Sequence, residues 1–126
     1  KLLYPERRVV AVTGDGGFLM NSQELETAVR LRLPLVILVW RDDGYGVIRW
    51  KQMVRFGRSA SVDFGNPDLV RYAESFGARG YRVSELSELG SVLTEAFQSA
   101  MPVVIDCAVD YEENLRLTDR LTLFRS

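Results

Sequence analysis

The sequence contains no histidine, and this absence excludes several kinds of active site. A chain without histidine cannot supply a Ser-His-Asp triad, a histidine general base or a histidine-ligated zinc. Any acid–base or metal chemistry that the chain performs must therefore depend on carboxylates.

Cysteine and long apolar runs are scarce as well. The single Cys107 excludes an intrachain disulfide and a cysteine-based metal cage, and its apolar neighbours predict a small buried residue in a strand. This cysteine usage fits a reducing, cytoplasmic setting. No apolar stretch approaches the roughly 18 residues of a membrane-spanning helix, and Pro5 interrupts the N-terminal residues too early for a signal sequence. We therefore expect no membrane segment.

The charges nearly cancel, with 16 Lys and Arg against 17 Asp and Glu and a net charge of −1. Such a balance argues against nucleic acid or an anionic membrane surface as a partner. In 126 residues, 47% are apolar and 26% are charged, as in an ordinary globular domain with a core. Because the chain lacks an initiator Met and enters a strand pattern almost at once, we expect residues 1–126 to be one domain of a longer enzyme.

Apolar runs alternate with amphipathic stretches along the chain. The runs at 9–12 and 35–40 predict two strands that are buried on both faces, as in a parallel sheet. Residues 78–83 and 103–109 are expected to form a third and a fourth strand. The amphipathic stretches predict three helices: one capped by Asn21 or Ser22, one starting at 66–68 with Pro67 in its first turn and ending at Gly77, and one capped by Ser84. Residues 47–56 are expected to form a further short helix, and 110–126 a charged tail.

This order of elements predicts an α/β fold, a doubly wound and mostly parallel sheet with helices on both faces. In such folds, ligands bind outside the carboxyl ends of the strands. Two unusual loops follow strand ends here: 13–17, which reads Thr-Gly-Asp-Gly-Gly as a tight glycine turn, and 41–46, which is rich in aspartate and glycine.

The two loops together offer groups for an anion and for a cation. Glycines allow close backbone approach to an anion, and Asp15 and Asp42 could place two carboxylate oxygens on one hard cation. These features suggest a diphosphate bridged by magnesium. The residues by themselves leave the ordinary alternative open, in which the glycines form a turn and the aspartates cap helices.

The spacing of these loops resembles a known cofactor motif. In thiamine diphosphate-dependent enzymes, Gly-Asp-Gly is followed about 27 residues later by Asn, and here Gly14-Asp15-Gly16 precedes Asp42 by that interval. Residues 18–25 are similar to the same segment of the acetohydroxyacid synthase and 2-oxo-acid decarboxylase superfamily. The segments most similar to the catabolic acetolactate synthase branch are 62–68, 72–78, 102–106 and 109–115. The chain is identified as a member of this family, as a C-terminal domain with the thiamine diphosphate-binding fold.

The resemblance implies a set of site residues. The cofactor-binding residues that it implies are Gly14, Asp15, Gly16, Gly17, Asp42, Gly44 and Tyr45. Of these, the side chains of Asp15 and Asp42 and the backbone carbonyl of Gly44 are the expected Mg²⁺ ligands. Two positions depart from the family pattern: Asp42 replaces the commoner Asn, and Arg41 replaces the Asn before it. We expect Arg41 to face solvent, with phosphate binding as the alternative.

The resemblance also implies an activity. It is the decarboxylation of pyruvate and carboligation to 2-acetolactate, with thiamine diphosphate and Mg²⁺ as cofactors. The implied partners are pyruvate or another 2-oxo acid, the pyrimidine-binding domain of the parent enzyme, and further copies in a homo-oligomer. The family's activating glutamate comes from the pyrimidine-binding domain, so no catalytic residue is assigned to this chain and the chain alone is expected to be inactive.

Two alternatives are considered beside this one. The same domain of a 2-oxo-acid decarboxylase, or of another carboligase, would carry the same cofactor residues. A receiver-type signalling module also binds magnesium through aspartates on an α/β fold, but it needs a lysine near its last strand. The only lysines here are Lys1 and Lys51, which disfavours the receiver.

Overall fold

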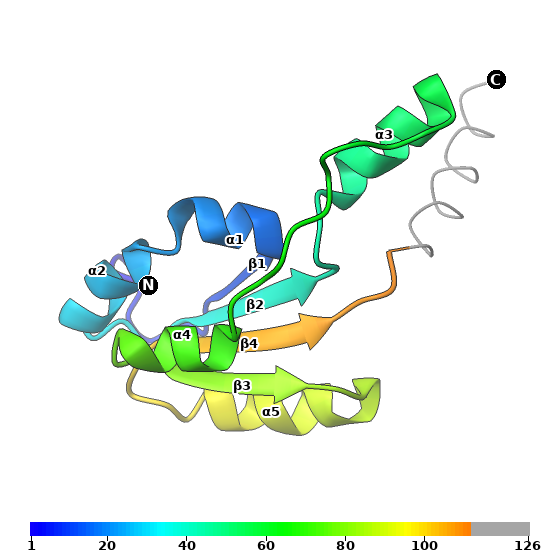
Figure 1. The fold of residues 1–126 in the computed structure, drawn as a ribbon. Coiled ribbons are helices and arrows are strands. Elements are labelled where there is room, and N and C mark those ends of the chain that lie inside the picture. Colours follow the sequence, from blue (N-terminus) through cyan, green and yellow to red (C-terminus); the bar gives the residue numbers. More distant parts are fainter. Residues whose placement is uncertain (112–126) are drawn as a thin grey trace, which may run out of the picture.

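A parallel β-sheet forms the centre of the computed structural model, which describes residues 1–111 (Figure 1). Its strands in that range are β1 (Val10–Gly14), β2 (Val36–Arg41), β3 (Arg79–Val83) and β4 (Val103–Ala108). Their order is β1-β2-β4-β3, and every pair is parallel. The predicted strands are confirmed to within one or two residues at their ends, and the predicted tail lies outside the described residues apart from its first two positions.

Helices cover both faces of the sheet, as the alternation of elements predicts (Figure 1). They are α1 (Asp15–Asn21), α2 (Glu24–Arg30), α3 (Gly46–Phe56), α4 (Leu69–Ser75) and α5 (Leu89–Ala96), with a 3-10 turn, η1 (Leu86–Glu88), before α5. The first face packs α1, α2 and α4 through Phe18, Leu25, Leu69, Ala73 and Val104. The second packs α5 through Val36, Leu38, Val83, Ala96 and Ile105. The doubly wound α/β class is thus confirmed.

The strand β1 is not buried on both faces, contrary to the prediction. Val10 is 41% exposed and Val12 is 60% exposed. The physical reason is its place at the edge of the sheet, where within the described residues it has a neighbour, β2, on one side. An apolar run has the same composition at an edge as in the centre, so the sequence did not distinguish the two.

The helix α1 was not predicted, and the helix predicted after Asn21 or Ser22 is α2, which follows its N-cap Gln23. α1 starts at Asp15, directly after β1, so Gly16 and Gly17 belong to its first turn and form no separate glycine turn. Gly14 is the residue before the helix, with extended backbone angles. Ser22 does not cap a helix: it lies in the break between α1 and α2, and its hydroxyl is hydrogen-bonded to the Tyr72 hydroxyl at 2.8 Å.

Two later helix starts also differ from the prediction, whereas the helix α3 is confirmed. Asp68 is the N-cap of α4 and accepts hydrogen bonds from the amides of Val70 and Arg71, so Pro67 lies outside the helix. Ser84 does not cap α5, because Glu85 and Glu88 form a capping box around η1 instead. Gly77 ends α4 as predicted, with a φ of 86° that favours glycine.

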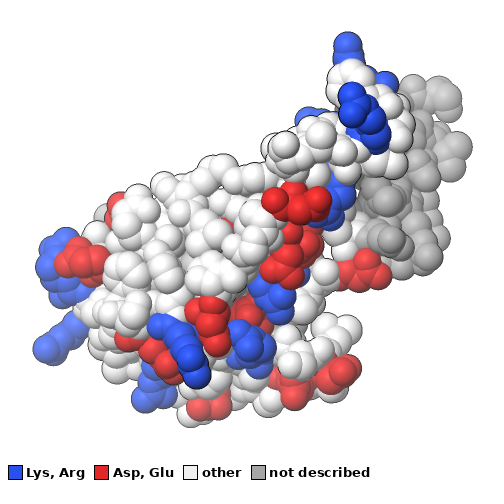
Figure 2. Space-filling view, in the orientation of Figure 1, with Lys and Arg blue, Asp and Glu red and all other residues white. Residues whose placement is uncertain are grey.

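Charged side chains of both signs lie close together over α4 and near the base of α3 (Figure 2). Among residues 1–111, no helix combines the length and the apolar character needed to cross a membrane.

Gly80 allows β3 and α4 to approach closely, and this contact gives the first prediction. A Cβ atom at position 80 would lie 2.7 Å from both the Cα and the carbonyl oxygen of Val70. We expect Gly80→Ala to lower the free energy of unfolding by about 1–3 kcal/mol, because backbone atoms must move. Gly90→Ala in α5 is the matched control: a Cβ there meets no atom within 4 Å, and the helix should gain at most about 1 kcal/mol. Urea unfolding measures the free energy of unfolding of each variant. An equal change in the two variants would contradict the prediction.

Candidate functional site

The carboxyl ends of β1 and β2 lie side by side, with Gly14 paired to Trp40. The loops that follow these strands therefore meet at one edge of the sheet. All seven residues that the resemblance implied as cofactor-binding line one pocket of about 270 Å³ at this edge. The pocket is completed by Gly46, Val47, Ile48 and Tyr111. The structure thus brings the implied residues together, between the β1–α1 and β2–α3 connections.

Asp15 is buried beneath this pocket, with only 1% of its surface exposed. Its Oδ1 accepts a hydrogen bond from the amide of Gly16 at 2.8 Å. Its Oδ2 accepts from the amide of Asp43 at 2.9 Å and from Nδ2 of Asn66 at 2.7 Å. Three neutral donors therefore fix the carboxylate, and none of these three donors neutralises its charge.

Asp42 is half-buried beside Asp15. Its Oδ2 is a buried atom with no hydrogen-bond partner in the described part of the chain. Burial raises the pKa of Asp42 above its ordinary value and the negative charge of Asp15 raises it further, while Arg49 acts in the opposite direction. Two neighbouring carboxylates, one with an unpartnered oxygen, form an arrangement that a cation would stabilise.

The wall of the pocket depends on glycine at two positions. A Cβ at Gly46 would lie 2.5 Å from Oδ2 of Asp42 and 2.6 Å from the ring of Tyr111. A Cβ at Gly16 would lie 2.9 Å from the ring of Tyr45, which in turn packs on Phe64 with ring centroids 4.9 Å apart. Side chains at these positions would occupy the space beside the carboxylates.

Arg41 does not face solvent, contrary to the prediction. Its side chain is only 25% exposed, and its guanidinium donates from Nε to Oδ1 of Asp106 at 2.8 Å and from Nη1 to Oδ2 of Asp43 at 3.0 Å. The reason is the buried carboxylate of Asp106 on the adjacent strand β4, which needs a cationic partner. Arg41 thus connects the end of β2 both to β4, through Asp106, and to the loop after β2, through Asp43.

Asp106 is a buried charged residue whose structural role our sequence analysis missed. It is 1% exposed, and its Oδ2 accepts from Nε of Arg82 at 2.9 Å. Arg82 also donates from Nη2 to Asp68, the cap of α4, at 3.0 Å. Arg41, Asp106 and Arg82 therefore join three adjacent strands. The signal for this role was present, because an aspartate in the otherwise apolar run 103–108 requires a buried partner.

Asn66 was also missed, because its position before Pro67 looks like an ordinary helix start. The structure places its side chain in the site, where Nδ2 donates to Asp15 and also to Oδ1 of Asp43 at 2.7 Å. Asn66 and Asp15 are 51 positions apart in the sequence. No local sequence pattern could therefore indicate this contact.

Two carboxylates line this pocket, but among the described residues they are not part of a complete metal site. Within residues 1–111, no group of three or more Cys, Asp or Glu side chains is arranged to hold a metal ion. A hard cation bound here would need further oxygen ligands from a backbone carbonyl or from a bound anion.

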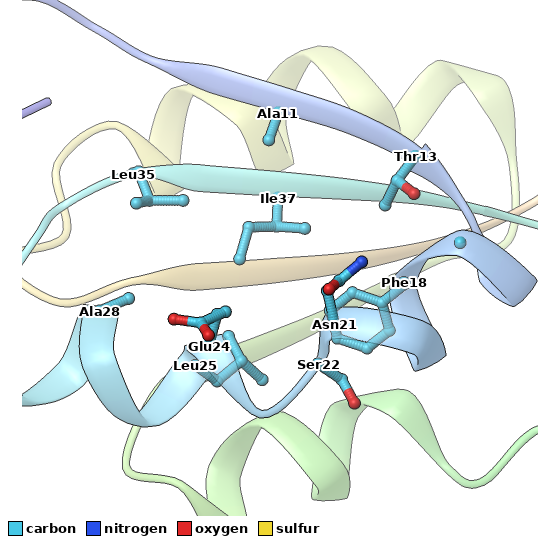
Figure 3. Close-up of a pocket in the computed structure, with 11 residues that line it drawn as sticks. Ala11, Thr13, Phe18, Asn21, Ser22, Glu24, Leu25, Ala28, Leu35 and Ile37 are labelled. Carbon is cyan, nitrogen blue, oxygen red and sulfur yellow. The ribbon is translucent and has the colours of Figure 1, made fainter.

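A second hollow, of about 320 Å³, lies between the β1–β2 edge and the α1–α2 segment (Figure 3). Its walls are largely apolar, with contributions from Ala11, Phe18, Leu25, Leu35 and Ile37. Glu24 is the one ionisable residue that lines it. This hollow lacks the paired carboxylates of the first pocket, so the first pocket is the candidate site.

Comparison with known proteins agrees with this geometry. Residues 1–107 match the family described as thiamine pyrophosphate enzyme, C-terminal TPP binding domain, and the chain belongs to this family. The predicted family resemblance and the predicted cofactor, thiamine diphosphate, are therefore confirmed.

The relatives of known name include three acetolactate synthases. The chain is 48% identical over 121 residues to acetolactate synthase of Bacillus subtilis, covering 95% of this chain and 21% of that protein. It is 41% identical over 122 residues to the catabolic acetolactate synthase of Raoultella terrigena, covering 97% and 22%. It is 38% identical over 120 residues to the acetolactate synthase isozyme 3 large subunit of Escherichia coli, covering 91% and 21%. The chain thus spans about a fifth of the length of these relatives.

The second prediction concerns the buried carboxylate of Asp106. We expect Asp106→Asn to lower the free energy of unfolding by about 2–3 kcal/mol, below the usual range for a broken buried pair because Arg41 and Arg82 still reach water. Glu26→Gln is the control, because Glu26 pairs with Arg30 on the exposed surface of α2 and should change the stability by less than about 0.5 kcal/mol. Equal midpoints of urea unfolding for the two variants would show that Asp106 has no such role.

Proposed function

We propose that this chain is the diphosphate- and metal-binding domain of an acetolactate synthase-like enzyme. In this proposal, Asp15, Asp42 and the backbone carbonyl of Gly44 hold a Mg²⁺ ion. The observation that carries it is the buried, unpartnered Oδ2 of Asp42 beside the buried carboxylate of Asp15. Two neighbouring carboxylates, of which Asp15 is held by neutral donors, suit a hard divalent cation, which takes its other ligands from oxygen atoms.

The pocket also suits the diphosphate of the cofactor. Gly14, Gly16 and Gly17 line it without side chains, so the backbone can approach an anion closely. Tyr45, which packs on Phe64 and lies against Gly16, lines the same pocket and would help to orient a bound cofactor. When bound, thiamine diphosphate supplies the electron sink for decarboxylation of a 2-oxo acid and for carbon–carbon bond formation. The residues of this chain bind and orient it.

The proposed reaction is the decarboxylation of pyruvate and transfer of the two-carbon unit to a second pyruvate, which gives 2-acetolactate and carbon dioxide. The 48% and 41% identities to two acetolactate synthases support this reaction over that of a 2-oxo-acid decarboxylase, which would use the same cofactor residues.

We further propose that the site is completed by a pyrimidine-binding domain and that the protein is a homo-oligomer. The apolar side chains of Tyr45, Val47 and Ile48 line the pocket and are exposed, and α3 projects away from the sheet (Figure 1). An exposed apolar face next to a ligand pocket supports packing by another domain. A cytoplasmic setting belongs to the same proposal, and the half-buried free thiol of Cys107 is compatible with it.

The third prediction tests the metal site. The intact protein should bind thiamine diphosphate in Mg²⁺ and lose this binding in EDTA. Asp15→Ala and Asp42→Ala should each weaken thiamine diphosphate binding by about 100-fold or more. This loss is larger than the roughly 10–100-fold expected when a residue that only supports a metal ligand is removed. Glu74→Ala removes an exposed carboxylate of α4 and should leave binding unchanged. Calorimetric titration decides the matter: heat that persists in EDTA, or in both aspartate variants, would refute the metal site.

The fourth prediction is that the 126-residue chain alone forms no acetolactate from pyruvate. The two carboxylates of the pocket are committed to the metal, and the chain has no histidine to act as a base. Colorimetric detection of acetoin after acid treatment measures the product. Product formed by the purified chain above a no-protein blank would contradict the proposal that a second domain supplies the catalytic group.

A further inference from the structure

We propose that Asn66 is a positioning residue that fixes the two metal-binding aspartates in place before the metal binds. This inference rests on the proposed metal role of Asp15 and Asp42. Asn66 lies in the segment between α3 and α4, which passes back across the carboxyl edge of the sheet (Figure 1).

The amide of Asn66 is a bridge between two carboxylates. Its Nδ2 donates to Oδ2 of Asp15 and to Oδ1 of Asp43, both at 2.7 Å. An amide nitrogen carries two hydrogens, so both are used. The orientation of the amide follows from its partners, because the turned amide would place its oxygen against two carboxylate oxygens that can only accept.

The chemistry of this donor suits a residue that supports metal ligands. A lysine or arginine at position 66 would hold the same carboxylates but would neutralise part of their charge and compete with a cation. The amide is neutral, so it fixes the carboxylate of Asp15 and leaves its negative charge available. Neutral donors that orient ligating carboxylates are a common feature of metal sites.

Asn66 also acts on the second ligand, through Asp43. Asp43 has a φ of 54°, a left-handed conformation, and it directly follows Asp42. The amide of Asp43 donates to Asp15, and its carboxylate accepts from both Asn66 and Arg41. Removing the Asn66 amide would therefore loosen the turn that carries Asp42 as well as the carboxylate of Asp15.

A purely local role for Asn66 does not account for these contacts. The N-cap of α4 is Asp68, which accepts from the amides of Val70 and Arg71 at 3.1 and 3.2 Å. Meanwhile Oδ1 of Asn66 is buried without a hydrogen-bond partner in the described residues, which is unfavourable for stability. The side chain is thus placed for its two donor contacts in the site.

The test compares Asn66→Ala with Asn21→Ala in the intact protein. Asn21 is an exposed asparagine at the end of α1, so the control makes the same chemical change away from the site. At saturating thiamine diphosphate and well below the melting temperature, the Mg²⁺ dissociation constant should rise 10–100-fold in Asn66→Ala, the range for residues that support metal ligands. In Asn21→Ala it should stay within about twofold. Mn²⁺ provides a spectroscopic probe, and its electron paramagnetic resonance spectrum in the site should change only in Asn66→Ala.

The outcomes separate this inference from the proposed function. If the wild-type protein binds thiamine diphosphate equally well in EDTA, the metal site itself is refuted. If wild-type binding requires Mg²⁺ but Asn66→Ala keeps the wild-type dissociation constant and Mn²⁺ spectrum, only the role of Asn66 is overturned. A lower melting temperature with unchanged Mg²⁺ affinity would also overturn it. Should Asn66→Ala fail to fold, Asn66→Ser, which keeps a single donor, is titrated with the same expectation of weaker Mg²⁺ binding.

Discussion

The buried carboxylate of Asp15 is the interaction on which the rest of the site depends. A charge removed from water is stable only when it is fully hydrogen-bonded, and the donors to Asp15 come from three separate segments of the chain. The first turn of α1, the loop after β2 and the segment before α4 must therefore all be in place for the aspartate to be buried. The same contacts that complete the fold at this edge of the sheet also shape the pocket.

A second buried carboxylate, Asp106, is stabilised in a different way, by cationic side chains. Two arginines pair with Asp106, so its charge is neutralised within the fold. The described hydrogen-bond donors to Asp15 are all neutral N–H groups, so none of them supplies a counter-charge. Both carboxylates are 1% exposed, but among the described contacts only Asp106 has cationic partners, which is why we propose a cation-binding role for Asp15 and a structural role for Asp106.

The sequence was sufficient where the determinants were local. Periodic apolar residues predicted the strands and most helices, and the loops after two strands located Asp15 and Asp42 because parallel strands end at one edge. The exposure of β1 depends on the sheet order, which periodicity does not encode. Asn66 and Arg41 find their partners 51 and 65 positions away, so only the tertiary structure could reveal their roles. The helix start at Asp15 was missed because two glycines there looked like a turn.

The sheet order also has a consequence for how the chain assembles during synthesis. The strand β4 lies between β2 and β3, yet it is the last of the described strands to leave the ribosome. Until β4 arrives, β3 has no partner among the described strands, and the edge of β2 that faces away from β1 is open. Pairing between segments so distant in sequence is slow, and exposed strand edges promote aggregation. Nascent chains from which β4 has not emerged should consequently expose strand edges that chaperones can cover, and pairing of β4 with β2 and β3 closes this part of the sheet.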